Sequence, residues 1–100
     1  MRTAIAIVAA LVLAGCDGAP KDAVRSLVRD PDSTQFRYVQ RCSHDRTVWR
    51  GDYNAKNGFG AYTGFQPFYY SEIDRAVATL EHGNFEALSN RCFGKYADQP

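Results

Sequence analysis

The chain has 100 residues, with 12 lysines and arginines against 11 aspartates and glutamates, and a formal net charge of +1. This length bounds the protein to one small domain. A balanced charge without a basic run excludes the electrostatic footprint of a nucleic-acid-binding protein and a polybasic membrane patch. The thirteen aromatic residues supply the large buried areas that a small core needs.

The N-terminal residues predict export. Arg2 precedes an uninterrupted apolar run, residues 4–14, which is shorter than the roughly 18 residues that span a membrane and is typical of a secretory signal. Residues 13–16 read Leu-Ala-Gly-Cys and resemble the lipobox of bacterial lipoproteins. The resemblance implies cleavage before Cys16 and acylation of its thiol and amine. Asp17 resembles the inner-membrane retention signal of enteric bacteria.

We therefore expect a signal peptide at residues 1–15, a lipidated tether at 16–21 and a single folded domain at 22–97. The mature chain would face the periplasm from the inner membrane, with the outer membrane as the alternative. An ordinary cleaved signal, in which Cys16 is incidental, is the competing interpretation.

The cysteine count predicts a disulfide. With Cys16 lipidated, Cys42 and Cys92 remain as a pair in an oxidising compartment. Their bridge would close a loop of about fifty residues and contribute roughly 4 kcal/mol to stability. Two free thiols or a metal site are the alternatives.

The first predicted element is a helix over residues 20–29, where apolar residues fall at helical spacing and Pro31 stops the helix. Residues 30–33 then read as a turn. A strand at 36–42 would place Phe36, Tyr38 and Cys42 on one face.

A second strand at 47–53 would place Trp49 and Tyr53 on one face, with Gly51 between them. A third extended segment, 65–70, contains Pro67 and therefore belongs at a sheet edge or begins irregularly. Residues 76–80 are either a fourth strand or the end of a helix that begins at 71.

A turn at 82–84 precedes a final helix, in which Phe85, Leu88 and Cys92 share a face. The predicted fold is α+β, with an N-terminal helix, a small antiparallel sheet of three to four strands and a C-terminal helix.

The densest stretch, residues 54–68, contains Gly58, Gly60 and Gly64. Their spacing misses the dinucleotide fingerprint by one residue, and no Gly-Lys-Ser/Thr triplet of a P-loop is present. We expect these glycines to supply positive φ or close packing. The aromatic side chains would then lie partly in the core: Phe59, Tyr62, Phe65 and Phe68.

The polar residues of this stretch form a candidate binding loop, composed of Asn54, Lys56, Asn57 and Tyr62. The alternative is that both asparagines cap turns and that Lys56 is solvated.

The sequence gives little support for a catalytic site or a metal-binding site. His44 and His82 with the two cysteines match no established zinc spacing. Ser43 adjoins His44 and Asp45, but adjacent residues rarely reach triad geometry. We expect no cofactor, metal or catalytic residue. Four arginines of the first hairpin could bind an anionic head group or an acidic partner, or lie solvated on the sheet: Arg37, Arg41, Arg46 and Arg50.

Two segments carry a family resemblance. Residues 30–36 fit DPDSxxF and residues 54–68 fit NxKNxFGxYxGFxxF. This pattern resembles a family of small exported proteins from Gram-negative bacteria and their prophages, and it covers most of the mature chain. The family has no assigned activity, so the resemblance adds no catalytic residue. Members often carry a cysteine ahead of the asparagine motif, whereas residues 47–53 contain none.

These observations predict a lipid-anchored, periplasm-facing, non-catalytic interaction module of the bacterial envelope, whose partner is another envelope protein. One alternative is a prophage-type exclusion or inhibitory lipoprotein that acts on a membrane protein. Another is a small hydrolase or metal-dependent enzyme.

Overall fold

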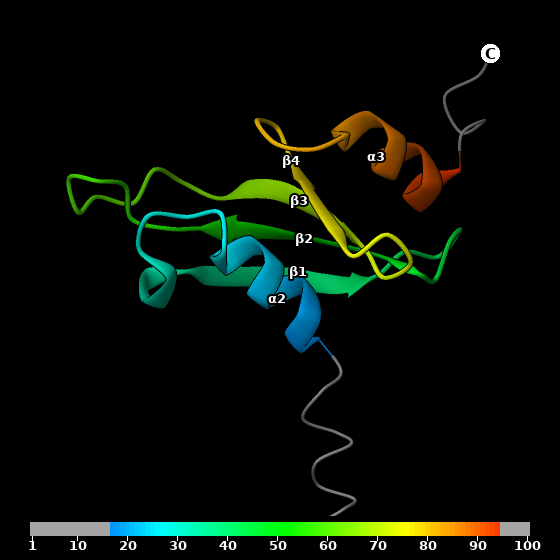
Figure 1. The fold of residues 1–100 in the computed structure, drawn as a ribbon, viewed down its shortest axis with the longest axis horizontal. Coiled ribbons are helices and arrows are strands. Elements are labelled where there is room, and N and C mark those ends of the chain that lie inside the picture. Colours follow the sequence, from blue (N-terminus) through cyan, green and yellow to red (C-terminus); the bar gives the residue numbers. More distant parts are fainter. Residues whose placement is uncertain (1–16, 95–100) are drawn as a thin grey trace, which may run out of the picture.

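The computed structural model describes residues 17–94, so the predicted signal peptide and Cys16 lie outside the described residues, as do residues 95–97 of the predicted domain. Figure 1 shows the elements, which in chain order are α2 (Gly18–Arg25), η1 (Pro31–Ser33), β1 (Gln35–Arg41), β2 (Val48–Asn54), β3 (Gln66–Ser71), β4 (Ala76–Thr79) and α3 (Phe85–Phe93). The strands form one antiparallel sheet in the order β1-β2-β3-β4. The α+β prediction is confirmed, and residues 76–79 form the fourth strand.

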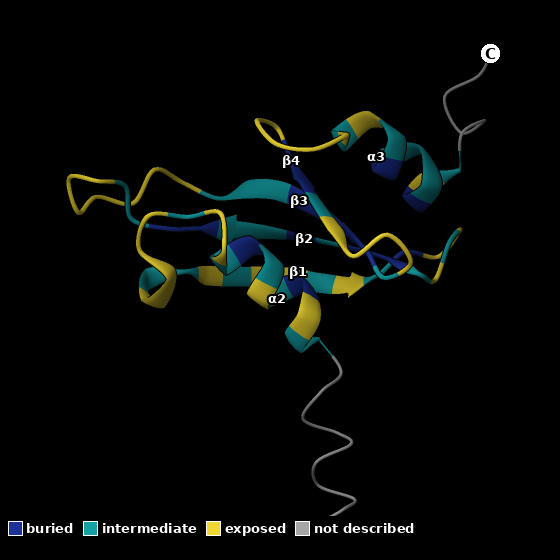
Figure 2. Cartoon of the chain, viewed as in Figure 1, coloured by how far each residue is buried: buried dark blue, intermediate teal, exposed yellow. Residues whose placement is uncertain are grey.

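The two helices lie on opposite faces of the sheet. Phe68 and Tyr69 are neighbours in β3, so their side chains point to opposite faces. Phe68 packs edge-on against Phe36, whose ring lies under Arg25 of α2; we call this side the α2 face. Tyr69 packs against Phe85 of α3 on the other side, the α3 face. Figure 2 shows that each helix turns a buried stripe inward and an exposed stripe outward.

Helix α2 starts and ends earlier than predicted. It begins at Gly18 with Asp17 as its N-cap and buries Pro20 and Val24, one turn apart. The expected tether at 16–21 therefore contains the first turn of the helix. The helix ends at Arg25 because the Ser26 hydroxyl donates to the Ala23 carbonyl oxygen at 2.6 Å, a local bond that competes with helix continuation.

A β-bulge interrupts β1. Its pairing with β2 shifts between Arg37 and Gln40, so Tyr38 and Val39 both lie opposite Gly51. Tyr38 adopts a φ of 59°, in the left-handed region where a non-glycine residue is strained by about 1 kcal/mol or more. A Cβ atom on Gly51 would lie 3.0 Å from the Val39 side chain. Glycine at this position therefore makes room for the bulge.

The bulge overturns the predicted alternation in β1. We expected Phe36, Tyr38 and Cys42 on one face, but the extra residue moves the second half of the strand by one position. Phe36 lies on the α2 face, whereas Cys42 is buried in the cluster on the α3 face. Tyr38 is 71% exposed. A bulge depends on the partner strand, which periodicity within one strand does not record.

Strand β3 is an inner strand, so an edge position for Pro67 is wrong. Pro67 is nevertheless tolerated because β4 pairs only with residues 68–71. On the β4 side of β3, no residue of β4 lies opposite Pro67 to accept a backbone N–H, which proline lacks. The alternative expectation, an irregular start of the strand, fits this arrangement.

A disulfide joins the start of the β1–β2 turn to α3. Cys42 and Cys92 are bonded, with their Cα atoms 4.9 Å apart, which confirms the predicted pair. The bridge lies in the main buried cluster, formed by Cys42, Val48, Tyr69, Ala78, Leu88 and Cys92. The predicted turn at 82–84 leads into α3, and the Asn84 side chain accepts the Ala87 N–H at 3.0 Å as its N-cap. Within residues 17–94, no helix is long and apolar enough to cross a membrane.

Candidate functional site

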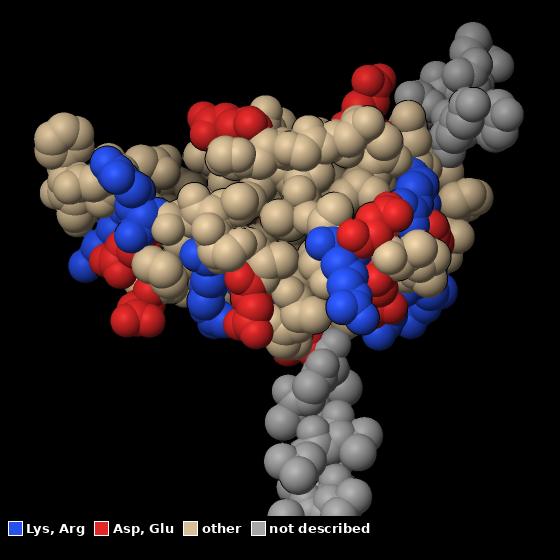
Figure 3. Space-filling view, in the orientation of Figure 1, with Lys and Arg blue, Asp and Glu red and all other residues tan. Residues whose placement is uncertain are grey.

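The longest loop of the described residues connects β2 to β3. This 55–65 loop projects beyond the sheet at the left edge of Figure 1. It contains most of the predicted binding residues. No charged residue occurs from position 57 to position 71, and Figure 3 shows the outer end of the molecule on this side without blue or red atoms.

Two asparagine side chains fix the shape of the loop. The Asn57 Oδ1 atom accepts the N–H groups of Phe59 at 2.8 Å and Ala61 at 3.2 Å, while the Asn57 N–H donates to the Ala61 carbonyl oxygen at 2.9 Å. Asn54 is 8% exposed, and its Oδ1 atom accepts the Gly64 N–H at 3.0 Å. Both asparagines thus bond to turn backbone, which supports their interpretation as structural residues.

Ser33 ties the loop to the preceding 3₁₀ helix. Its carbonyl oxygen accepts the Tyr62 hydroxyl at 2.8 Å, and its Oγ atom accepts the Lys56 N–H at 3.0 Å. Lys56 also pairs with Tyr62 across the loop, and its Nζ atom lies 5.7 Å from the Tyr62 ring centroid. Lys56 is therefore in contact with an aromatic ring and is not simply solvated. The two segments of the family pattern meet at Ser33.

Phe59 occupies the tip of the loop and is 96% exposed. Its expected place in the core is therefore wrong, whereas Phe68 is fully buried as predicted. Gly60 and Gly64 adopt φ values of 80° and 107°, and nothing lies within 4 Å of the point where a Cβ atom would stand on either residue. Glycine is needed there for conformation and not for close packing. The sequence signal for this exposure is the pair of glycines that flank Phe59. Because glycine has no side chain, no adjacent residue can form a buried apolar face together with Phe59.

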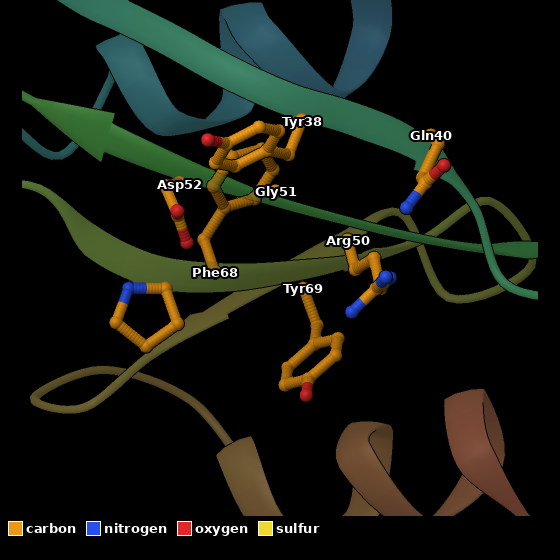
Figure 4. Close-up of a pocket in the computed structure, with 8 residues that line it drawn as sticks. Tyr38, Gln40, Arg50, Gly51, Asp52, Phe68 and Tyr69 are labelled. Atoms are coloured by element: carbon orange, nitrogen blue, oxygen red, sulfur yellow. The ribbon is translucent and has the colours of Figure 1, made fainter.

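A concavity of ≈ 210 Å³ lies on the part of the α3 face that α3 leaves uncovered. Figure 4 shows it between the side chains of β1, β2 and β3. Its lining includes Tyr38, Gln40, Arg50, Asp52, Pro67 and Tyr69. At one side of it, Arg37 Nε donates to Asp52 Oδ2 at 3.0 Å, and the Arg37 guanidinium carbon lies 4.0 Å from the Phe65 ring centroid.

The hairpin arginines named from the sequence do not share one face of the sheet. Arg37 and Arg50 lie on the α3 face beside the concavity. Arg41 stacks on Trp49, 4.5 Å from its ring centroid, and pairs with Glu72. Trp49 shares the α2 face with Gly51, two residues along β2. The bulge in β1 causes this division.

A second polar cluster surrounds Arg91 of α3. Arg91 Nε donates to Asp45 Oδ2 at 3.2 Å, and Nη1 donates to Asp74 Oδ2 at 2.9 Å. Asp45 Oδ1 also accepts the hydroxyl of Thr47 at 2.6 Å and its N–H at 3.0 Å. The cluster ties α3 to the β1–β2 and β3–β4 turns, so its polar atoms are used in internal bonds.

Three groups have shifted pKa values, and two of them, Asp45 and Arg91, belong to this cluster. Hydrogen bonds from the Thr47 hydroxyl and N–H lower the pKa of Asp45, with Arg91 adding to the effect against partial desolvation. Desolvation lowers the pKa of Arg91, but its hydrogen bonds to two carboxylates outweigh this and raise it overall. Burial raises the pKa of the Tyr53 hydroxyl. All three groups therefore keep their ordinary charge at neutral pH.

The histidines are not brought together. Ser43 and His44 lie in the β1–β2 turn, whereas His82 lies in the β4–α3 turn at the opposite end of the sheet. Among residues 17–94, no group of three histidine, cysteine, aspartate or glutamate residues is placed to hold a metal ion. The cysteine thiols that a zinc site would require form the disulfide.

Comparison of the chain with family models, with curated proteins and with solved structures finds no match. The resemblance to small exported proteins therefore stays a prediction from the sequence pattern.

Proposed function

We propose that this protein is a lipid-anchored, periplasm-facing, non-catalytic interaction module, and that its 55–65 loop binds another protein of the bacterial envelope. The observation that carries this proposal is Phe59, a large apolar side chain that is 96% exposed at the tip of a loop. Single exposed apolar residues are common on protein surfaces. Phe59 differs because the backbone that presents it is held by side-chain hydrogen bonds.

A preformed loop suits binding on energetic grounds. Ordering a flexible segment on association lowers affinity, and a loop already fixed by Asn57 and Asn54 avoids much of that loss. Because residues 57–71 carry no charge, burial of the tip desolvates no ionic group. A phenyl ring that enters a pocket of the partner would act as the central anchor of the interface.

The proposed lipid anchor is supported by the lipobox at residues 13–16 and by the position at which the folded domain begins. Asp17 is the N-cap of α2, so a lipid on Cys16 would hold the domain directly at the membrane surface. Several acyl chains on one residue give durable attachment, since each buried methylene contributes about 0.8 kcal/mol. A Cys16→Ser variant should lose lipid labelling and leave the membrane fraction. Unchanged membrane association would refute the anchor.

Photocrosslinking tests the binding loop. A photoreactive amino acid replaces Ala61, an exposed residue two positions from Phe59, in the full chain in intact cells. We expect one discrete adduct with a membrane or envelope protein, lost when Phe59→Ser is added. Ile73→Ser is the matched control, because Ile73 is 69% exposed and lies in the β3–β4 turn, outside the loop. An adduct that survives Phe59→Ser contradicts the proposal.

A further inference from the structure

We propose that the concavity on the α3 face is a second binding site, in which Arg50 binds a carboxylate group presented on a peptide. Its lining comes from β1, β2 and β3 and excludes Phe59 and the tip of the 55–65 loop. The inference therefore goes beyond the proposed function and does not depend on it.

Arg50 is held in place by neutral groups. Its guanidinium carbon lies 5.2 Å from the Phe93 ring centroid. When the Gln40 amide is turned so that its oxygen faces Arg50, that oxygen accepts hydrogen bonds from Nη2 at 2.9 Å and from Nε at 3.3 Å. Within residues 17–94 no carboxylate forms an ion pair with Arg50, whereas Arg37 on the same face pairs with Asp52. A guanidinium carries five N–H donors, so Arg50 is fixed while several donors stay available.

The bulge in β1 supplies one wall of the site. Tyr38 adopts its strained φ of 59° and lines the concavity. The guanidinium carbon of its neighbour Arg37 lies 5.2 Å from the centroid of the Tyr38 ring. Bulges occur frequently where a side chain must be aimed at a site, and backbone strain persists there when the surroundings hold it. Tyr69, whose hydroxyl lies 3.4 Å from Ser89 Oγ, forms the opposite part of the lining.

The size of the concavity and the charged side chains that line it favour one class of ligand. The concavity of ≈ 210 Å³ accommodates a group of about one or two amino-acid residues and is smaller than typical drug-sized pockets. Asp52 lies two residues from Arg50 on the same face, about 7 Å away along the strand. Its carboxylate, paired with Arg37, repels a phosphate dianion more strongly than a singly charged carboxylate, and its second oxygen can accept an N–H next to a bound carboxylate. The shared chemistry is therefore a peptide carboxylate, from a chain terminus or from an acidic side chain.

The test uses the full-length protein in detergent micelles and follows the arginine Nε–Hε signals by NMR. Three peptide probes are titrated: N-acetyl-dialanine, its C-terminal amide, and N-acetyl-aspartic acid α-amide. We expect saturable shifts of the Arg50 signal with either carboxylate and none with the neutral amide. Tighter binding of N-acetyl-dialanine assigns the site to chain termini. Tighter binding of the aspartate derivative assigns it to acidic side chains.

Substitutions give the matched comparison. Arg50→Gln should weaken carboxylate binding about tenfold or more, because charge-assisted hydrogen bonds are lost. Arg46→Gln removes the same charge from an exposed turn residue and should change affinity less than about twofold. Arg50→Lys keeps the charge but loses the planar donor pair, so binding should fall several-fold. This variant decides the question if Arg50→Gln fails to fold.

Three results would overturn the site. The neutral amide could bind as well as the acid, or Arg50→Gln could bind like Arg46→Gln. Inorganic phosphate could also shift the Arg50 signal at the same or lower concentration, which would mean general anion attraction without carboxylate recognition.

Discussion

The two ends of the sheet are built by different means. At one end, which we call the clasped end, the β1–β2 and β3–β4 turns are joined to α3 by a disulfide and by the Arg91 cluster. At the other end, the 55–65 loop is held by backbone N–H groups that donate to Asn54 and Asn57 and by the Tyr62 hydroxyl, which donates to Ser33. The clasped end joins residues up to 50 positions apart. The outer part of the loop is shaped by contacts within about ten positions, and two bonds to Ser33, over 23 and 29 positions, tie its base to the 3₁₀ helix.

This difference separates the residues that stabilise the whole domain from those that hold the exposed loop in its conformation. Long-range links restrict the unfolded chain and stabilise the whole domain. Local side-chain to backbone bonds shape a segment without burying it. The clasped end therefore holds a small fold together, while the loop exposes an aromatic side chain in a fixed conformation. Four substitutions test this division, in order of decreasing effect on the free energy of unfolding.

Removal of the disulfide should have the largest effect. The Cys42→Ala, Cys92→Ala double variant loses a link that closes a loop of 50 residues, and we expect a loss of about 4 kcal/mol in the free energy of unfolding. Urea denaturation measures it. Reduction of the wild-type protein should produce a similar loss and leave the double variant unchanged. Equal stability with and without the bridge would remove the main support of the clasped end.

Asn54→Ala should have the next largest effect, because Asn54 is buried at the end of β2, where the loop begins. The substitution leaves the Gly64 N–H without its acceptor, and we expect a loss of about 1–2 kcal/mol. Asn57→Ala is the matched variant in the exposed part of the loop. It should leave global stability within about 0.5 kcal/mol but accelerate amide exchange at Phe59 and Ala61. If both variants lose stability equally, the loop is not locally shaped.

Asp45→Asn tests the clasped end through pH. The folded-state pKa of Asp45 lies below its unfolded value, so the carboxylate stabilises the fold above about pH 4 and this contribution is lost as pH falls through the folded pKa. After allowance for solvent screening, we expect the variant to be about 1 kcal/mol less stable at pH 7.

The stability gap between Asp45→Asn and the wild type should close below about pH 4. Asp22→Asn is the control, because its side chain is 77% exposed and its pair with Arg25 is expected to add little. A gap that does not change between pH 7 and pH 3 would show that the Asp45 charge is not the source of the effect.

Phe59→Ser should have the smallest effect on stability, within about 0.5 kcal/mol, because the side chain is 96% exposed. The same substitution is expected to abolish the photocrosslinked adduct described above. Thermal unfolding and crosslinking of one variant therefore separate the two roles. A marked loss of stability would mean that Phe59 contributes to the core in solution.

The parts of the fold that depend on local patterns could be predicted from the sequence. Helical spacing identified α3 from Phe85, Leu88 and Cys92, and the number of cysteines identified the disulfide. Both signals lie in residue type and position alone. The β1–β2 hairpin and the turn before α3 were predicted for the same reason.

The remaining features depend on contacts between distant residues. The bulge at Tyr38 requires Gly51 on the next strand, and Arg91 bonds to Asp45, which lies 46 positions earlier. The bulge residue Tyr38 from β1 and Arg50 from β2 both line the concavity. No pattern within a single segment records these pairings. The exposure of Phe59 was missed because aromatic residues in a small domain are usually needed in its core.

The position of α2 limits how far the module reaches. Asp17 lies at the N-cap position of the helix, so with a lipid on Cys16 the chain would have no spacer of flexible residues. A linker of twenty residues would let a domain explore roughly 25 Å from its attachment point. With that anchor and no linker, the 55–65 loop would stay close to the bilayer, and the search for a partner would become two-dimensional. The proposed partner would then lie in the same membrane, or extend down to its surface.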